Sequence, residues 1–200
     1  DINTGFNEYS PVLTNNNKVM YFTARRSNTT GGKMNEYDQN YFEDIYRAKW
    51  NSETNRWDSI TNKLGRINGE EFESISHISA DGLTAFITLN TTANNNAKIK
   101  TGSSDIAEVK WTNQNQWSAP KLVAGINSSF YDGNATVTAD ETTMYFVSER
   151  NGEKNMSDIY VSYKNGKAWS KPIALPKEIN TKGRETTPFI TPDGKYLFFS

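Results

Sequence analysis

The sequence predicts an all-β protein assembled from repeated four-stranded antiparallel sheets. The first observation behind this prediction is a motif that begins with Ile-Asn and occurs four times along the chain. The second is that the intervals between its copies contain the same succession of short apolar runs and polar turns. The third is that no segment shows a sustained helical apolar period, so no helix of consequence is expected. A regular recurrence of this kind indicates a repeat architecture.

Each copy of the motif keeps a constant spacing between three positions. A turn residue lies thirteen positions after the asparagine of the Ile-Asn pair, and a carboxylate lies eight positions before that turn residue. The asparagines are Asn3, Asn68, Asn127 and Asn180. The turn residues are Asn16, Asp81, Asp140 and Asp193, and the carboxylates are Glu8, Glu73, Asp132 and Glu185. Successive asparagines are 65, 59 and 53 residues apart.

Each repeat is expected to form four strands. First strands are predicted at residues 10–14, 74–79, 134–138 and 187–191, each ending in Asn or Asp turn chemistry. The second strand is the apolar run after that turn, and its two apolar faces suit a strand covered on both sides. Third strands are predicted at residues 44–50, 105–111 and 158–163, each beginning with Asp-Ile. The fourth strands carry Trp57, Trp117 and Trp169.

Four antiparallel strands that recur at this interval describe the blade of a β-propeller. We expect about three and a half blades, at residues 8–64, 73–123, 132–175 and, for the half blade, 185–200. Propellers typically contain 4–8 blades, so the chain is expected to be a fragment of a longer protein.

Composition excludes several classes of protein. The net charge of −1 does not support a general nucleic-acid or anionic-membrane surface. The absence of cysteine removes disulfides, thiolate nucleophiles and cysteine-bound metals. No apolar run is long enough to cross a bilayer, so direct membrane insertion is not expected.

The repeats carry a family resemblance. Ser10-Pro11, Thr187-Pro188 and the run from Pro192 to Lys195 before an aromatic strand resemble the TolB-like, WD-type propeller repeat. The first repeat, with Glu8-Tyr9-Ser10-Pro11 and residues 41–46, resembles propeller regions of Bacteroidota envelope proteins that also contain tetratricopeptide repeats and an OmpA-like domain. The resemblance implies a periplasmic, outer-membrane-associated protein whose partners are other envelope proteins. It implies contact with peptidoglycan only through domains outside this chain.

The sequence offers little catalytic chemistry. The single histidine, His77, lies in a predicted first strand beside Ile78, which favours packing over catalysis. One histidine without cysteine makes the usual zinc sites unexpected, and no metal or cofactor is predicted. A Ser-His-Asp triad stays open, although no Gly-x-Ser-x-Gly elbow is present.

The four carboxylates are expected near the mouth of the propeller channel. A ring of like charges there could bind a cation or a basic ligand group. Recurrence in every repeat favours a structural role instead, as acceptors of hydrogen bonds within the blades. Paired carboxylates also serve glycoside hydrolysis, which keeps a glycan-active propeller as an alternative. A propeller attached to a peptidase whose catalytic domain lies outside the chain is a further alternative.

Only the loops between second and third strands vary in length, and such variation on a rigid scaffold is typical of recognition sites. The first of these loops, residues 25–43, is the predicted contact region. Its charged and aromatic anchors are Arg25, Arg26, Lys33, Tyr37, Tyr41 and Phe42. The sequence therefore favours a non-catalytic, protein-binding propeller of the cell envelope.

Overall fold

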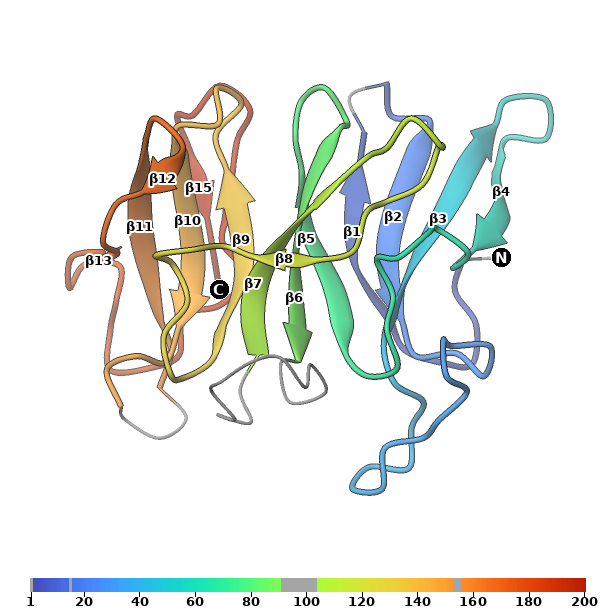
Figure 1. Ribbon diagram of the computed structural model, residues 1–200, viewed down its shortest axis with the longest axis horizontal. Coiled ribbons are helices and arrows are strands. Elements are labelled where there is room, and N and C mark those ends of the chain that lie inside the picture. The colour runs from blue at the N-terminus through green and yellow to red at the C-terminus, as the bar shows by residue number, and fades with distance from the viewer. Residues whose placement is uncertain (1, 15, 91–103, 153–155) are drawn as a thin grey trace. The chain divides into compact units, whose positions relative to one another are not determined.

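The computed structural model describes residues 2–14, 16–90, 104–152 and 156–200 (Figure 1). Throughout these residues the chain forms strands, turns and loops, and no helix occurs among them. The chain divides into two compact units. The first comprises residues 1–85 and 109–120, and the second comprises residues 86–108 and 121–200.

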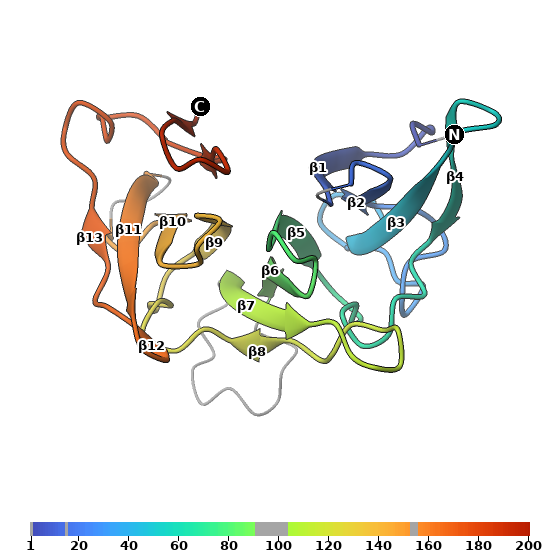
Figure 2. The same ribbon diagram turned by 90° about the horizontal axis from the view of Figure 1, so that it is seen from above.

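The first sheet has the strand order that a propeller blade requires. It runs β1-β2-β3-β4, and all three pairings are antiparallel. The strands are β1 (Glu8–Leu13), β2 (Val19–Ala24), β3 (Asp44–Asn51) and β4 (Arg56–Thr61). Figure 2 views these strands from above and shows them as successive members of one twisted sheet.

The later repeats follow the same plan. One sheet has the order β5-β6-β7-β8, with strands Glu73–Ile78, Thr84–Asn90, Ser104–Lys110 and Lys121–Leu122. The next has the order β9-β10-β11-β12, with strands Asp132–Val137, Thr143–Ser148, Asp158–Asn165 and Ala168–Trp169. Strand β13 (Ile173–Ala174) also pairs with β11, and β14 (Phe189–Ile190) pairs with β15 (Leu197–Phe198). The predicted all-β class and its four-stranded sheets are confirmed.

A side-chain cap forms the turn between the first two strands of each repeat. In the third repeat Asp140 Oδ1 accepts hydrogen bonds from Thr138 Oγ1 at 2.6 Å and from Thr142 N at 3.1 Å. Asn16, Asp81 and Asp193 make the corresponding bonds. The next residue needs a positive φ, which glycine adopts freely at Gly82 and Gly194. Glu141 adopts a φ of 57° at this position, so the turn forms there despite its weaker sequence signal.

The fourth strand of the second repeat differs from the prediction. Trp57 lies in β4 and Trp169 lies in β12, as expected, but Trp117 lies outside the strands and makes only isolated bridges with Trp111 and Gly65. The physical reason is that the backbone of Trp117 pairs with the connector before β5: Trp117 N donates to Leu64 O at 2.8 Å, and Trp117 O accepts a hydrogen bond from Arg66 N at 3.0 Å. Trp117 is nevertheless buried, with its ring edge-on to Tyr21 at 5.8 Å.

Each unit has an apolar cluster of its own. In the first unit Phe22, Ala24, Tyr46 and Ala48 form a buried group. The larger cluster of the second unit is centred on β9 and β10 and contains Phe86, Ile106, Val123, Ile126, Ala135, Val137, Met144, Phe146 and Tyr160. The isoleucine of the Ile-Asn motif contributes directly to this core, since Ile126 is completely buried.

The asparagine of the motif binds the backbone of the preceding third strand. Asn127 accepts a hydrogen bond from Ile106 N at 2.9 Å and donates one to Ile106 O at 2.9 Å. Asn68 makes the same pair of bonds with Ile45, and Asn180 makes them with Ile159. The amide group therefore takes the place that a neighbouring strand would occupy, which explains why the motif requires asparagine.

Substitution of Asn127 by alanine is expected to lower the free energy of unfolding by about 1–3 kcal/mol. The change leaves the N–H of Ile106 without its partner at a buried strand and removes one of the two hydrogen bonds to Ile106 O, which Val123 N still donates to at 3.0 Å. Urea unfolding followed by tryptophan fluorescence measures the loss. The control is Asn165→Ala at the exposed end of β11, where less than about 0.5 kcal/mol is expected. Equal losses in the two variants would contradict the assigned role of Asn127.

Candidate functional site

Two of the recurring carboxylates are each held by the same pair of groups. Glu8 accepts hydrogen bonds from Thr4 Oγ1 at 2.5 Å and from Arg26 Nε at 3.1 Å. Asp132 accepts them from Ser128 Oγ at 2.7 Å and from an Arg150 nitrogen at 2.6 Å. In both repeats the hydroxyl lies four residues before the acid and the arginine lies eighteen residues after it.

Each of these arginines also contacts a backbone carbonyl and two aromatic rings. Arg26 also donates to Ile2 O, and its guanidinium lies 5.3 Å from the ring centroid of Phe22 and 5.0 Å from that of Tyr46. Arg150 donates to Ile126 O and lies against the rings of Phe146 and Tyr160 in the same manner. We call this arrangement of carboxylate, hydroxyl, arginine and two rings the arginine box.

In each arginine box the guanidinium forms an ion pair that compensates the negative charge of the carboxylate. Burial raises the pKa of Glu8, but hydrogen bonds from Thr4 and Arg26 outweigh it, and the net pKa is lowered. The Asp132 side chain is fully buried and forms an ion pair with Arg150. Arg26, a predicted contact residue, lies within the first box and its side chain is only 11% exposed.

The second repeat departs from this pattern at Glu73. Gly69 occupies the position of Thr4 and Ser128, so no hydroxyl is present there. The position of the two arginines is taken by Thr91, which lies outside the described residues. Glu73 is only 7% exposed, and its Oε2 has no hydrogen-bond partner among the described residues. Within the described part of the chain, Glu73 is thus a buried acid without the two groups that hold the carboxylate in the first and third repeats.

The surroundings of Glu73 disfavour its charged form. Burial raises its pKa to about 8, against a backbone hydrogen bond from Gly69. The negative charges of Asp44, Glu43 and Glu71 raise this pKa further. Burial also raises the pKa of Glu43 and of Asp44, and each of these two acids has a buried oxygen that no described residue hydrogen-bonds.

The remaining acidic positions have local partners. Glu185 accepts a hydrogen bond from Thr181 Oγ1 at 2.6 Å, while its Oε2 is buried and has no hydrogen-bond partner in the part of the chain that the structure describes. Asp44 Oδ2 accepts bonds from Thr30 N at 2.8 Å and from Asn62 Nδ2 at 2.7 Å, which ties the first variable loop to β3.

The first variable loop is cross-linked by its own side chains. Arg25 donates two bonds to the carboxylate of Asp38, at 2.6 and 3.1 Å, and a third to Tyr41 O at 2.6 Å. Between these contacts Tyr37 is 99% exposed. Figure 1 shows this loop, between β2 and β3, extending beyond the ends of the strands it joins.

The other predicted contact residues of the loop lie at its base. Tyr41 packs edge-on against Phe6 at 5.9 Å, and Phe42 packs edge-on against Phe72 at 4.8 Å. Lys33 forms an exposed ion pair with Glu70 at 2.5 Å. The structure therefore does not gather the six predicted residues into one patch, and Tyr37 is the aromatic side chain that it leaves fully accessible.

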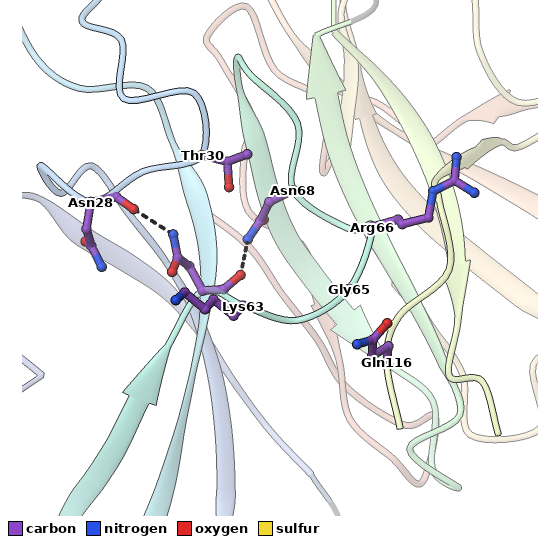
Figure 3. Close-up of a pocket in the computed structure, with 8 residues that line it drawn as sticks. Asn28, Thr30, Lys63, Gly65, Arg66, Asn68 and Gln116 are labelled. Carbon is purple, nitrogen blue, oxygen red and sulfur yellow. Dashed lines mark hydrogen bonds between the residues drawn. The ribbon is translucent and has the colours of Figure 1, made fainter. Parts of the chain in front are cut away.

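A polar pocket of about 510 Å³ lies in the first unit (Figure 3). Sequence reasoning did not identify it, because its walls come from segments far apart in the chain. Its lining residues are Asn28, Thr30, Asn62, Lys63, Gly65, Arg66, Asn68 and Gln116. Four of these are carboxamides, two are cations and none is acidic. The side chain of Asn62 donates to Asn28 O at 2.8 Å, and Asn62 O accepts a hydrogen bond from Asn68 Nδ2 at 3.0 Å. Figure 3 draws dashed lines from Asn28 and from Asn68 for these bonds.

Further observations limit the chemistry of the described residues. Burial lowers the pKa of His77 to about 4, so this side chain is neutral at physiological pH. No cluster of three or more His, Cys, Asp or Glu residues suited to a metal ion occurs within residues 2–14, 16–90, 104–152 and 156–200. Over the same residues no helix is long and apolar enough to cross a membrane.

The strand order and the sheet pairings define a β-propeller, a fold built from blades of four antiparallel strands. No protein-family model matches the sequence, and no curated protein matches it either.

Solved structures are similar to the chain in fold. A putative TolB from Agrobacterium tumefaciens is 16% identical over 98% of this chain and 54% of its own length, with a TM-score of 0.59. A thermostable family-43 glycoside hydrolase is 16% identical over 94% of this chain and 62% of its own, also at 0.59. The periplasmic gluconolactonase PpgL of Pseudomonas aeruginosa is 8% identical over 95% of this chain and 49% of its own, at 0.53. The chain thus spans about half to two thirds of the length of these structures, and the likeness concerns the fold.

Proposed function

We propose that this chain is part of a non-catalytic propeller that binds another protein in the bacterial cell envelope. The observation that carries the proposal is Tyr37, an almost completely exposed aromatic side chain on a loop that Arg25 holds in shape. Tyrosine is enriched among the residues that dominate binding energy at protein interfaces. A loop already ordered by internal bonds loses little further entropy on binding.

The polar pocket extends the proposed contact surface. Asn28 and Thr30 belong to the loop that carries Tyr37, so the pocket begins at the base of that loop. Its two cations, Lys63 and Arg66, suit an acidic group on the partner, and its carboxamides suit a polar one.

The proposed location is the periplasm, with association to the outer membrane through other parts of the protein. This part of the proposal rests on the likeness of the first repeat to Bacteroidota envelope proteins with an OmpA-like domain. The fold similarity to TolB and to a periplasmic gluconolactonase is consistent with it. Other envelope proteins are the proposed partners.

A glycan-active or peptidase-associated propeller is the second candidate, and one observation favours it. Glu73 has a pKa of about 8 and is therefore largely protonated near neutral pH, as a general acid must be. Hydrolysis of a panel of glycosides or peptides by the purified protein, abolished by Glu73→Gln, would replace the binding proposal with this one.

Photo-crosslinking tests the binding proposal. A photoreactive phenylalanine analogue in place of Tyr37 is expected to capture a specific envelope protein, whereas the same analogue in place of Tyr163 is not. Tyr163 is the matched control because it is 50% exposed on β11 in the second unit. Tyr37→Ala should then weaken the captured protein's affinity by at least about tenfold without changing stability. Identical capture from both positions, or unchanged affinity of Tyr37→Ala, would refute the proposal.

A further inference from the structure

The polar pocket of the first unit has the size and the walls of a ligand site. Its volume of about 510 Å³ falls in the range of about 300–1,000 Å³ that holds a whole small molecule rather than one charged group. Among the described residues that line it, none is apolar or aromatic, and all except Gly65 have a polar side chain. A ligand that suits such walls is polar along its whole length.

The two cations of the pocket are available to a ligand. Lys63 and Arg66 are exposed, and neither side chain forms an ion pair or a hydrogen bond with another described residue. Asp44 accepts hydrogen bonds from the wall residues Thr30 and Asn62, but it is completely buried and does not line the pocket. The described surface of the pocket is therefore positive and favours an anion.

The cations are spread along the pocket on a fixed connector. In the view of Figure 3, Lys63 and Arg66 lie on opposite sides of Gly65. Gly65 has a φ of 101°, and a Cβ there would lie 2.6 Å from Trp117 O, so the close approach of the connector requires glycine. Trp117 also hydrogen-bonds Leu64 O and Arg66 N, which holds the connector in place. Two separated cations suit separated single charges better than one multiply charged phosphate.

The carboxamides supply hydrogen bonds for uncharged polar groups. Asn28 Oδ1 accepts a hydrogen bond from Tyr46 Oη at 2.8 Å, which orients the side chain and leaves Nδ2 without a partner among the described residues. The exposed Gln116 side chain makes no hydrogen bond within the described part of the chain. A carboxamide both donates and accepts, as a hydroxyl group does, so the two groups pair well.

We propose that this pocket binds an acidic oligosaccharide, a short chain of sugars that carries carboxylates. Lys63 and Arg66 pair with the carboxylates, and the guanidinium can donate two parallel hydrogen bonds to one of them. Asn28 and Gln116 bond the sugar hydroxyls. The connector is already in shape, so little entropy is lost on binding. This site goes beyond the protein contact at Tyr37, does not depend on it, and involves no bond cleavage.

Titration of the isotope-labelled protein with digalacturonate tests the proposal. Galactobiose is its neutral counterpart, and a blocked aspartyl-aspartate dipeptide has the same charge without hydroxyl groups. The side-chain amide signals of Asn28 and Gln116 in nuclear magnetic resonance spectra report on the pocket directly. Digalacturonate is expected to bind at least about tenfold more tightly than either comparison ligand, which corresponds to about 1.4 kcal/mol. Added salt should weaken its binding, because the cations are exposed to solvent.

Variants of the two cations make the result specific. Lys63→Gln and Arg66→Gln should each weaken digalacturonate binding by at least about fivefold. Both side chains are exposed, so the fold should tolerate these changes. The matched control is Lys49→Gln, which removes an exposed cation from β3 of the same unit and should bind as the original protein does. Tyr37→Ala should also retain binding, which separates this site from the proposed protein contact.

Several results would overturn the proposal. One is the absence of digalacturonate binding, and another is equal affinity for galactobiose, which would show that charge has no part. Unchanged affinity in the variant that combines Lys63→Gln with Arg66→Gln would place the ligand elsewhere. Equal or tighter binding of the dipeptide would assign the pocket to an acidic segment of a protein partner instead of a glycan.

Discussion

Substitution of Arg150 by alanine is expected to lower the free energy of unfolding by about 3–5 kcal/mol. The change leaves the fully buried carboxylate of Asp132 without its ion-pair partner. It also removes a hydrogen bond to Ile126 O and the packing of the guanidinium against Phe146 and Tyr160. Urea unfolding at pH 7, followed by intrinsic fluorescence, measures the loss.

The matched control for Arg150 is Arg184→Ala. Arg184 pairs with Glu149 at 3.8 Å, but its side chain is 57% exposed, so a loss below about 1 kcal/mol is expected. Adding Asp132→Asn to Arg150→Ala should recover part of the stability, because it removes the unpaired negative charge of the buried Asp132 carboxylate. Comparable losses for the two arginines would show that the arginine box does not stabilise the third repeat.

Substitution of Glu73 by glutamine is expected to remove a large pH dependence of stability. Because the pKa of Glu73 is raised from 4.5 to about 8, the folded protein binds more protons than the unfolded chain between these values. Its free energy of unfolding should therefore fall as the pH rises from about 4.5 to 8, by roughly 3–5 kcal/mol. Glu73→Gln should flatten this fall and be the more stable protein at pH 8. Unfolding curves at pH 5, 6.5 and 8 measure the effect.

Glu8→Gln provides a control of opposite sign. The pKa of Glu8 is lowered in the folded protein, so its carboxylate stabilises the fold above the unfolded pKa, and this contribution is lost on acidification. Glu8→Gln should therefore destabilise the protein at neutral pH. If Glu73→Gln behaved in the same way, Glu73 would be charged and paired in the folded protein, contrary to the environment described.

Much of the fold could be predicted from local signals. The turns follow from side chains that cap their own backbone, as Asp140 does with Thr142, and such bonds depend on near neighbours in the chain. The fourth strand of the second repeat was less predictable, because the backbone of Trp117 hydrogen-bonds to Leu64 and Arg66, which lie far earlier in the chain. Trp117 was expected in a strand and is instead buried beside Tyr21.

The site was less accessible to sequence reasoning. The recurring carboxylates were found, but their arginine partners were not, although Arg26 and Arg150 each lie ten residues after a turn residue. That spacing, and the glycine at position 69 where other repeats have a hydroxyl, were available signals. The polar pocket carried no such signal, because Asn28, Arg66 and Gln116 are brought together only by folding.

Residue periodicity and short-range hydrogen bonds make the four-stranded unit, its turns and the asparagine that closes it predictable from the sequence. Only the tertiary structure shows that Glu8 and Asp132 pair with arginines and that Glu73 and Glu185 do not among the described residues. The charge state of an acid depends on burial and on groups distant in sequence, such as Arg150 for Asp132 and Asp44 for Glu73. Four residues that look equivalent in the Ile-Asn motif are therefore distinct in the folded protein: Glu8 and Asp132 pair with arginines, whereas Glu73 and Glu185 have no cation partner in the described part of the chain.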